Sequence, residues 1–158
     1  MRVDAYHDDE YTAIVNIKKV DESAKVPTRG SDDAAGYDLY AHLDVDEVLI
    51  QPGETVKIGT GICAKIPRGW FGALFARSGL ASKKGLRPAN CTGVIDSDYT
   101  GEIIVAIHND SKDFQTVTNG ERVAQLVVIP FLPIEFSEVD ELDKTDRGAD
   151  GFGSTGSM

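Results

Sequence analysis

The segment from Thr55 to Ile66 alternates apolar and other side chains, and this alternation limits the fold more than any other feature of the chain. Its apolar residues lie at every second position, with a gap at residue 60. An extended strand therefore places them on one face, whereas a helix would scatter them around its axis. Strand-like composition recurs at residues 13–17, 70–76, 102–108 and 122–131. The chain is therefore expected to be built mainly from β-strands.

Turn signals containing Gly or Pro separate these stretches. Pro52-Gly53 and Asn119-Gly120 are typical of tight turns between strands. Their spacing along the chain favours an all-β sandwich or barrel. One short helix is expected from Ser78 to Lys84, with Ser78 as the candidate N-cap and Gly85 as the residue that ends it.

The length of 158 residues is that of one domain of common size. Composition changes after Phe136, because residues 137–146 are acidic and residues 147–158 are rich in Gly and Ser. We therefore predict a β-barrel domain over residues 1–136, with residues 1–12 as a disordered extension. Residues 137–158 are predicted to form a mobile C-terminal arm.

The formal net charge of −10 argues against stable nucleic-acid binding, which requires a basic surface. Any anionic ligand would need cations supplied locally by the site. Cys63 and Cys91 form no C-x-x-C pair, so neither a zinc site nor a redox pair is indicated. The sequence contains no signal peptide, transit sequence or apolar run of membrane-spanning length, so a cytoplasmic location away from membranes is expected.

The segment 90–102 contains the strongest candidate for chemistry. Its apolar strand, residues 94–95, ends at Asp96, and Tyr99 follows in a turn before the strand that begins at Glu102. A carboxylate at the tip of such a hairpin can hold a water as general base. The ring can pack on a sugar, and the backbone amides can read the edge of a base. The alternative interpretation is an ordinary turn Asp, which is common.

Two further segments contain groups suited to an anion. Arg77 precedes Ser78-Gly79, which would open the short helix with outward-facing amides and a hydroxyl group. In the segment 33–41, small residues allow two backbones to approach closely, and Asp38 lies where a strand begins. The alternatives are an N-cap beside a surface Arg and a solvated turn Asp.

Gln125 lies in an apolar strand of the segment 120–126, between Ala124 and Leu126. If the amide is buried it needs a hydrogen-bond partner, which a ligand oxygen can supply. The alternative is a strand Gln that faces solvent. Arg122 in the same segment is interpreted as a structural ion-pair partner.

The segment 147–156 combines an Arg, four glycines and a Ser-Thr pair, which together suit a loop that cradles phosphates. Composition alone would favour a flexible tail. The lone aromatic, Phe152, decides against that interpretation, because an aromatic ring can stack on a base with a contribution of about 1–3 kcal/mol. We therefore expect this part of the arm to close over a nucleotide.

Taken in chain order, the segments 33–41, 75–86, 90–102, 120–126 and 147–156 resemble the five motifs of the trimeric dUTPases, the deoxyuridine triphosphate pyrophosphatases. The resemblance covers about residues 27–156. It implies a distorted jelly-roll barrel and a homotrimer with shared active sites, in which the arm closes over the site of a neighbouring subunit. It also implies hydrolysis of dUTP to dUMP and pyrophosphate, which keeps uracil out of DNA and supplies dUMP for thymidylate synthesis.

The resemblance also implies a role for each motif residue. Asp96 is the general base that activates the attacking water. Base and sugar contacts are implied for Asn90, Gly93, Val94, Ile95, Tyr99 and Phe152, with Tyr99 leaving no room for a 2′-hydroxyl group. Phosphate contacts are implied for Arg77, Ser78, Gly79, Gln125, Arg147, Gly153, Ser154 and Thr155. The implied cofactor is Mg²⁺, held mainly by the substrate phosphates, with help from Asp38 through water.

Three alternatives remain at this point. The dCTP deaminases share the fold, but they carry a catalytic Glu at the position that Ala106 occupies here, which argues against deamination. A regulatory protein could use the same fold to bind a partner, and a pull-down with and without dUTP would detect it. A purely structural β-sandwich trimer would leave the segment 147–156 without a purpose.

Overall fold

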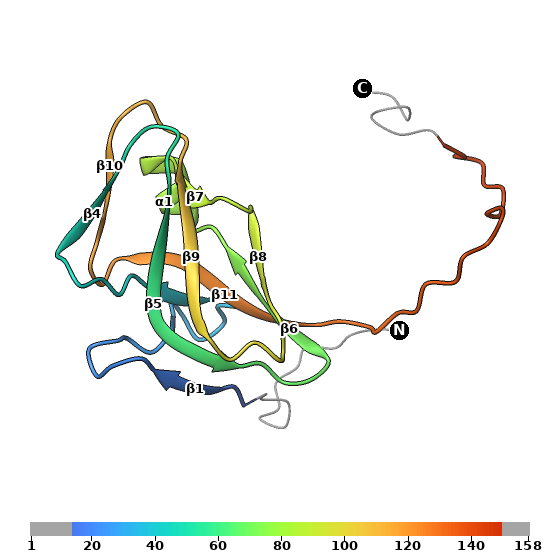
Figure 1. The fold of residues 1–158 in the computed structure, drawn as a ribbon, viewed down its shortest axis with the longest axis horizontal. Coiled ribbons are helices and arrows are strands. Elements are labelled where there is room, and N and C mark those ends of the chain that lie inside the picture. The colour runs from blue at the N-terminus through green and yellow to red at the C-terminus, as the bar shows by residue number, and fades with distance from the viewer. Residues whose placement is uncertain (1–13, 150–158) are drawn as a thin grey trace.

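The computed structural model describes residues 14–149 and shows two antiparallel sheets around one core, with a smaller two-stranded ribbon at one end (Figure 1). The four-stranded sheet has the order β1 (Asn16–Lys19), β5 (Thr55–Lys65), β9 (Glu102–Asn109), β7 (Leu86–Pro88). The five-stranded sheet has the order β2 (Thr28–Arg29), β3 (Tyr37–Tyr40), β11 (Arg122–Pro130), β6 (Trp70–Phe75), β8 (Thr92–Ile95). The ribbon pairs β10 (Gln115–Thr118) with β4 (Glu47–Ile50). This arrangement confirms the predicted all-β fold and is that of a jelly roll.

Alternating side chains form the core between the sheets. In β9, Ile103, Val105 and Ile107 are buried, whereas the residues between them face outward. Ile58 and Ile62 of β5 are buried in the same way, as its alternation predicts. The sandwich is therefore held by the burial of apolar area on the facing sides of its sheets.

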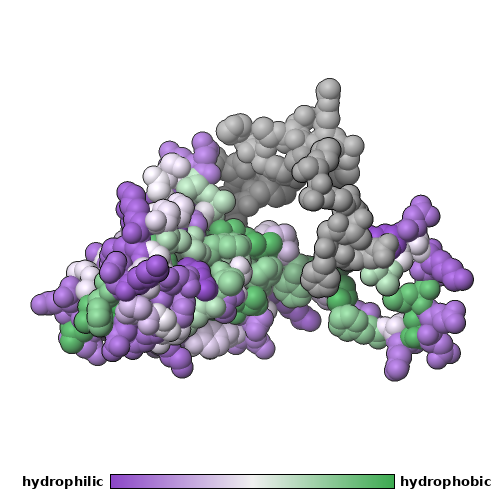
Figure 2. All heavy atoms as spheres, turned by 90° about the horizontal axis from the view of Figure 1, so that it is seen from above, coloured by the Kyte–Doolittle hydropathy of each residue, from purple (hydrophilic) through white to green (hydrophobic). Residues whose placement is uncertain are grey.

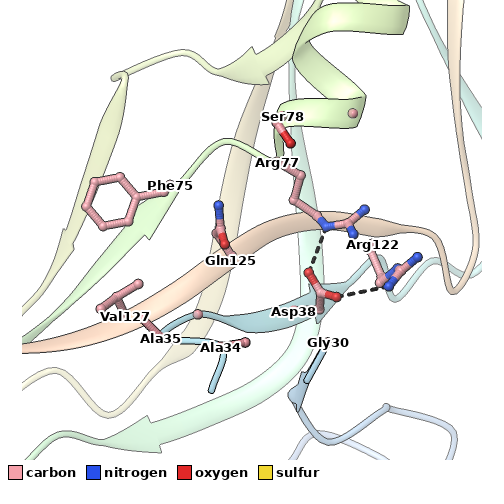
Figure 3. Close-up of a pocket in the computed structure, with 12 residues that line it drawn as sticks. Gly30, Ala34, Ala35, Asp38, Phe75, Arg77, Ser78, Arg122, Gln125 and Val127 are labelled. Atoms are coloured by element: carbon pink, nitrogen blue, oxygen red, sulfur yellow. Dashed lines mark hydrogen bonds and ion pairs between the residues drawn. The ribbon is translucent and has the colours of Figure 1, made fainter. Parts of the chain in front are cut away.

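Helix α1 (Ser78–Lys84) connects the two sheets and places its N-terminus beside β11 (Figures 1 and 3). Leu80 anchors it in the core, and Gly85 ends it in the left-handed region at φ 66°. The predicted N-cap is wrong by one residue, because Arg77 occupies that position with extended backbone and without a side-chain cap. Ser78 is instead the first helical residue, and only two residues separate it from the end of β6 at Phe75.

Most predicted strands are confirmed within a residue or two. The strand predicted at 13–17 is β1, which begins a few residues later, at Asn16. The predicted disordered extension, residues 1–12, lies outside the described residues. Strands β2, β4, β7 and β10 escaped prediction because each has two to four residues and shows no clear alternation.

Residues 131–149 leave the body as an exposed segment without helix or strand, and it runs away from the barrel (Figure 1). Leu132, Ile134 and Phe136 are among its most exposed apolar side chains. Figure 2 shows hydrophobic residues along this segment and at the point where it leaves the barrel. Among residues 14–149, no helix is long and apolar enough to span a bilayer.

Candidate active site

The first of two relevant pockets, here called the arginine pocket, has a volume of about 420 Å³ and lies between β3, β11 and the start of α1 (Figure 3). Its lining residues come from three of the five motif segments and their neighbours: Gly30, Ala34, Ala35, Gly36, Asp38, Phe75, Arg77, Ser78, Gly79, Arg122, Gln125 and Val127. The structure therefore brings together the predicted residues Asp38, Arg77, Ser78, Gly79 and Gln125.

Asp38 holds two arginines on the wall of this pocket. Arg77 Nε donates to Asp38 Oδ1 across 2.7 Å, and Arg122 Nη1 donates to Asp38 Oδ2 across 3.1 Å. The Asp38 side chain is only 10% exposed. With two guanidinium groups against one carboxylate, these three side chains carry one net positive charge, in a chain whose net charge is −10. The pocket therefore supplies the local cations that an anionic ligand needs.

The helix start contributes exposed polar groups beside the arginines. Ser78 and Gly79 are both exposed, and the first amide groups of a helix have no partner within the helix. A Cβ added at Gly79 would meet nothing within 4 Å, so the space in front of this backbone is open. An anion can therefore approach the amides and the Ser78 hydroxyl group directly.

Gln125 spans the floor of the arginine pocket. Its Nε2 donates to the carbonyl of Ala76 across 3.0 Å, so one side of the amide is already engaged. A Cβ at Gly36 would lie 2.6 Å from Gln125 Oε1, so a side chain at that position would have to displace the Gln125 amide. The small residues of segment 33–41 are expected to let two backbones approach closely. In the structure, the close approach is instead between the backbone at Gly36, just before β3, and the Gln125 side chain of β11.

The second pocket, here called the aspartate pocket, has a volume of about 210 Å³. It is lined by Val94, Ile95, Asp96, Tyr99, Glu102 and Ile104. Asp96 is exposed at the start of the turn, and its carbonyl accepts the Tyr99 N–H across 3.1 Å. Lys65 Nζ donates to the carbonyl of Ser97 across 2.8 Å, which fixes the turn against β5. The pocket combines a free carboxylate with an aromatic ring, as the sequence predicts.

The predicted hairpin around Asp96 is wrong in its pairing. Strand β8 pairs with β6, whereas β9 pairs with β5 and β7, so the turn at 96–101 connects two different sheets. Adjacent strands that look like a hairpin in sequence can separate in this way when each finds a longer partner elsewhere. The carboxylate therefore lies at an edge between the sheets rather than at the tip of a two-stranded ribbon.

Asn90 and Gly93 lie at the entry to β8 and line neither pocket. Asn90 is exposed in the turn that precedes β8, next to Cys91 with its positive φ of 60°. Gly93 is buried, and a Cβ there would lie 3.1 Å from the Leu74 side chain, so β8 packs closely on β6 at this position. Their predicted contacts with a base remain predictions.

The two pockets lie at opposite ends of β6. Ile95 is paired with Gly72, which places Asp96 opposite Phe71, whereas Phe75 at the far end of the strand lines the arginine pocket. Four residues of extended strand correspond to roughly 13 Å. A group in the arginine pocket is therefore out of hydrogen-bond reach of Asp96 in the same chain.

Among residues 14–149, no group of three or more His, Cys, Asp or Glu side chains could hold a metal ion. Asp38 is the carboxylate that lines the arginine pocket, and both its oxygens accept from arginines. Mg²⁺ is commonly held by one or two carboxylates together with substrate phosphates and waters. A single carboxylate in a pocket suited to phosphate is compatible with a Mg²⁺ ion that is held mainly by a phosphate ligand and its waters.

The arm contributes one described candidate residue. Arg147 lies in its exposed, described part, whereas Phe152, Gly153, Ser154 and Thr155 lie outside the described residues. Arg122 is confirmed as an ion-pair partner, and it also lines the arginine pocket. Its position next to Glu121 in the sequence gives no sign of this second role. Ala106 lies on β9, where it offers no carboxylate for deamination.

Comparison with known proteins agrees with this arrangement. A protein-family model described as dUTPase matches residues 22–156. A deoxyuridine 5′-triphosphate nucleotidohydrolase of Desulfitobacterium hafniense is 51% identical over 137 residues, covering 86% of this chain and 90% of that protein. The protein of the same name from Escherichia phage T5 is 47% identical over 137 residues, covering 84% of this chain and 92% of that protein.

Solved structures show the same fold. The dUTPase of Staphylococcus bacteriophage 80alpha, solved as a variant with dUpNHpp, has a TM-score of 0.79 and 30% identity, covering 92% of this chain and 100% of that one. The dUTPase of phage phi11 of S. aureus, solved as a variant that reveals the coordination of a structural Mg(II) ion, has a TM-score of 0.71 and 26% identity. That comparison covers 82% of this chain and 98% of the other.

Proposed function

This chain belongs to the dUTPase family, and from that membership and the geometry of its pockets we infer that it hydrolyses dUTP to dUMP and pyrophosphate. The observation that supports this most is the arginine pocket, in which three motif segments far apart in sequence meet around Asp38. The cellular consequence is that uracil is kept out of DNA and dUMP is supplied for thymidylate synthesis.

We propose that the working site combines the arginine pocket of one chain with the aspartate pocket of another. Within one chain, roughly 13 Å of strand β6 separates the register position of Asp96 from Phe75 at the arginine pocket. A homotrimer with three shared sites joins the two pockets across subunit interfaces. The arm, residues 137–158, then closes over the site of a neighbouring subunit.

In the proposed reaction, Asp96 takes a proton from a water while the oxygen of that water bonds to the α-phosphorus. The bond between the α-phosphorus and the bridging oxygen breaks, and pyrophosphate leaves with the electron pair. The phosphates are held by Arg77, Ser78, Gly79, Gln125, Arg147, Gly153, Ser154 and Thr155. These donors face the charge that develops on the phosphate oxygens, which is where electrostatic stabilisation is most effective.

Selectivity for the nucleotide is assigned to the aspartate pocket and the residues around it. The base and sugar are proposed to contact Asn90, Gly93, Val94, Ile95, Tyr99 and Phe152. Tyr99 packs against the deoxyribose and leaves no room for a 2′-hydroxyl group. When bound with the substrate, Mg²⁺ would supply charge neutralisation and fix the phosphate conformation, and Asp38 would help to hold it through water.

We propose the cytoplasm as the location, since both cysteines are free thiols in the described structure. Stable nucleic-acid binding is not proposed, because the net charge of −10 opposes it. A regulatory partner would bind in addition to the enzyme activity and would be found by a pull-down with and without dUTP.

Hydrolysis in ¹⁸O-labelled water tests the proposed position of attack. Attack on the α-phosphorus places the label in dUMP and leaves pyrophosphate unlabelled. Mass spectrometry of the two products reads this directly. Label found in pyrophosphate would mean that the water attacks the β-phosphorus, and it would overturn the proposed attack on the α-phosphorus.

A further inference from the structure

Strand β5 bulges where it passes the start of β9. Its pairing with β9 shifts between Gly59 and Cys63, and Gly61 in the bulge has a φ of 67°, in the left-handed region. A bulge of this kind leaves backbone groups without partners in the ladder. Those groups must bond elsewhere if they are shielded from water.

Three backbone groups in and beside the bulge bond to partners from outside strand β5. The His42 N–H donates to the Gly59 carbonyl across 2.8 Å, and the Val20 N–H donates to the Gly61 carbonyl across 2.7 Å. The Gly61 N–H donates to Glu102 Oε1 across 2.7 Å. Glu102 is therefore the side chain that completes the bulge.

Other contacts show how tightly this carboxylate is seated. A Cβ at Gly59 would lie 2.7 Å from Glu102 Oε1. Beside it, the fully buried Thr60 donates its hydroxyl group to the carbonyl of Ile103 across 2.7 Å. Within residues 14–149, Glu102 forms no ion pair, so its role is as a hydrogen-bond acceptor rather than a charge partner.

The same residue holds Tyr99 through its backbone. Tyr99 Oη donates to the Glu102 carbonyl across 2.7 Å, and a Cβ at Gly101 would lie 2.7 Å from that hydroxyl oxygen. Tyr99 as a residue is 43% exposed, so packing alone does not fix the position of its ring. The ring orientation thus depends on this hydrogen bond and on the space left by Gly101.

We propose that Glu102 is a positioning residue for sugar selectivity, which acts through the β5 bulge and its own carbonyl to hold the Tyr99 ring in place. This rests on the proposed function, in which Tyr99 faces the deoxyribose. The side chain of Glu102 bonds to the bulge and so fixes the start of β9. The backbone carbonyl of Glu102, which is fixed in this way, accepts a hydrogen bond from the Tyr99 hydroxyl group. Loss of either contact frees the ring and admits a 2′-hydroxyl group.

The test is the ratio of kcat/KM for dUTP to kcat/KM for UTP. Glu102→Ala is expected to lower this ratio about three- to tenfold, the factor that corresponds to one ordinary hydrogen bond. Glu102→Gln, which keeps Oε1 as an acceptor for Gly61 N–H, is expected to stay close to the wild-type ratio. Tyr99→Phe, which removes the donor, is expected to lower the ratio as Glu102→Ala does.

A double-mutant cycle separates positioning from general destabilisation. If both residues act through one contact, the double variant Glu102→Ala/Tyr99→Phe loses no more selectivity than either single variant. Additive losses, or an unchanged ratio in a folded Glu102→Ala variant, would overturn the proposal. If Glu102→Ala does not fold, Tyr99→Phe decides alone, since an unchanged ratio there removes the hydroxyl group from selectivity. A wild-type protein that hydrolyses no dUTP would overturn the proposed function itself, and this proposal with it.

Discussion

Arg77 donates from Nε to Asp38 Oδ1 across 2.7 Å, and this contact ties the residue before helix α1 to strand β3. Arg122 engages the other carboxylate oxygen from β11. The Asp38 side chain is 10% exposed, whereas those of Arg77 and Arg122 are 26% and 49% exposed. The carboxylate thus lies beneath both guanidinium groups and orients them toward the pocket.

Replacing this carboxylate should cost stability. Asp38→Ala is expected to lower the free energy of unfolding by about 1–3 kcal/mol, because two charge-assisted hydrogen bonds are lost while both arginines keep access to water. Urea denaturation at fixed protein concentration measures the change. Asp44→Ala, at an exposed position, is the matched control. Equal midpoints for the two variants would show that Asp38 does not hold the arginines in place.

Asp96→Asn should abolish most turnover without unfolding the protein. The expected loss in kcat is about 10²–10⁴-fold, which is typical for removal of a general base. Asp96 is exposed and uses its backbone carbonyl in the turn, so the melting temperature should stay the same. Asp98→Asn, an exposed carboxylate in the same turn, is the control and should remain active. Near-normal kcat in Asp96→Asn would remove this residue from the mechanism.

A shared site predicts complementation between inactive subunits. Asp96→Asn damages only the aspartate pocket and Arg77→Ala only the arginine pocket, so each variant alone should have little activity. Refolding an equimolar mixture should restore about a quarter of wild-type activity, because random assembly pairs intact halves at that frequency. Pyrophosphate release before and after mixing measures this. A mixture with no more activity than its separate components would place both pockets of one site in one chain.

Asp21, in the loop between β1 and β2, should make the stability of the protein depend on pH. Bonds from the Ser23 side chain and backbone lower the pKa of Asp21, and His42, whose Nε2 lies 2.9 Å from Asp21 Oδ2, lowers it further. Since the folded state favours the ionised form, this stabilisation is complete above the unfolded pKa and disappears as the pH falls through the folded one. Asp21→Asn should therefore be less stable than wild type near neutral pH and equally stable well below roughly pH 4. A difference that persists at low pH would contradict the assignment.

Much of this fold follows from local patterns in the sequence. The alternation in 55–66 predicts β5, because the two faces of that strand meet different surroundings, and the strand-like composition of 102–108 predicts β9. The end of α1 follows from Gly85, which adopts the left-handed conformation that favours glycine. These features depend on neighbours in the chain and are accessible without a structure.

The remainder depends on contacts between distant segments. The separation of β8 from β9 cannot be read from their closeness in sequence, because it depends on the pairing of β8 with β6. The sequence likewise places Asp38, Arg77 and Arg122 in separate motifs, and only the packing of β3, α1 and β11 makes them one cluster. The acceptor role of Glu102 needs the β5 bulge, which no local pattern indicates.

The most direct test of the central claim is pyrophosphate release with Mg²⁺ from dUTP, measured beside dTTP, dCTP and UTP under the same conditions. We predict release from dUTP and little from the other three, because the aspartate pocket selects both base and sugar. Parallel measurement of ammonia would detect deamination of dCTP. Equal rates with all four nucleotides, or no release from dUTP, would contradict the assignment of this protein as a selective dUTP diphosphatase.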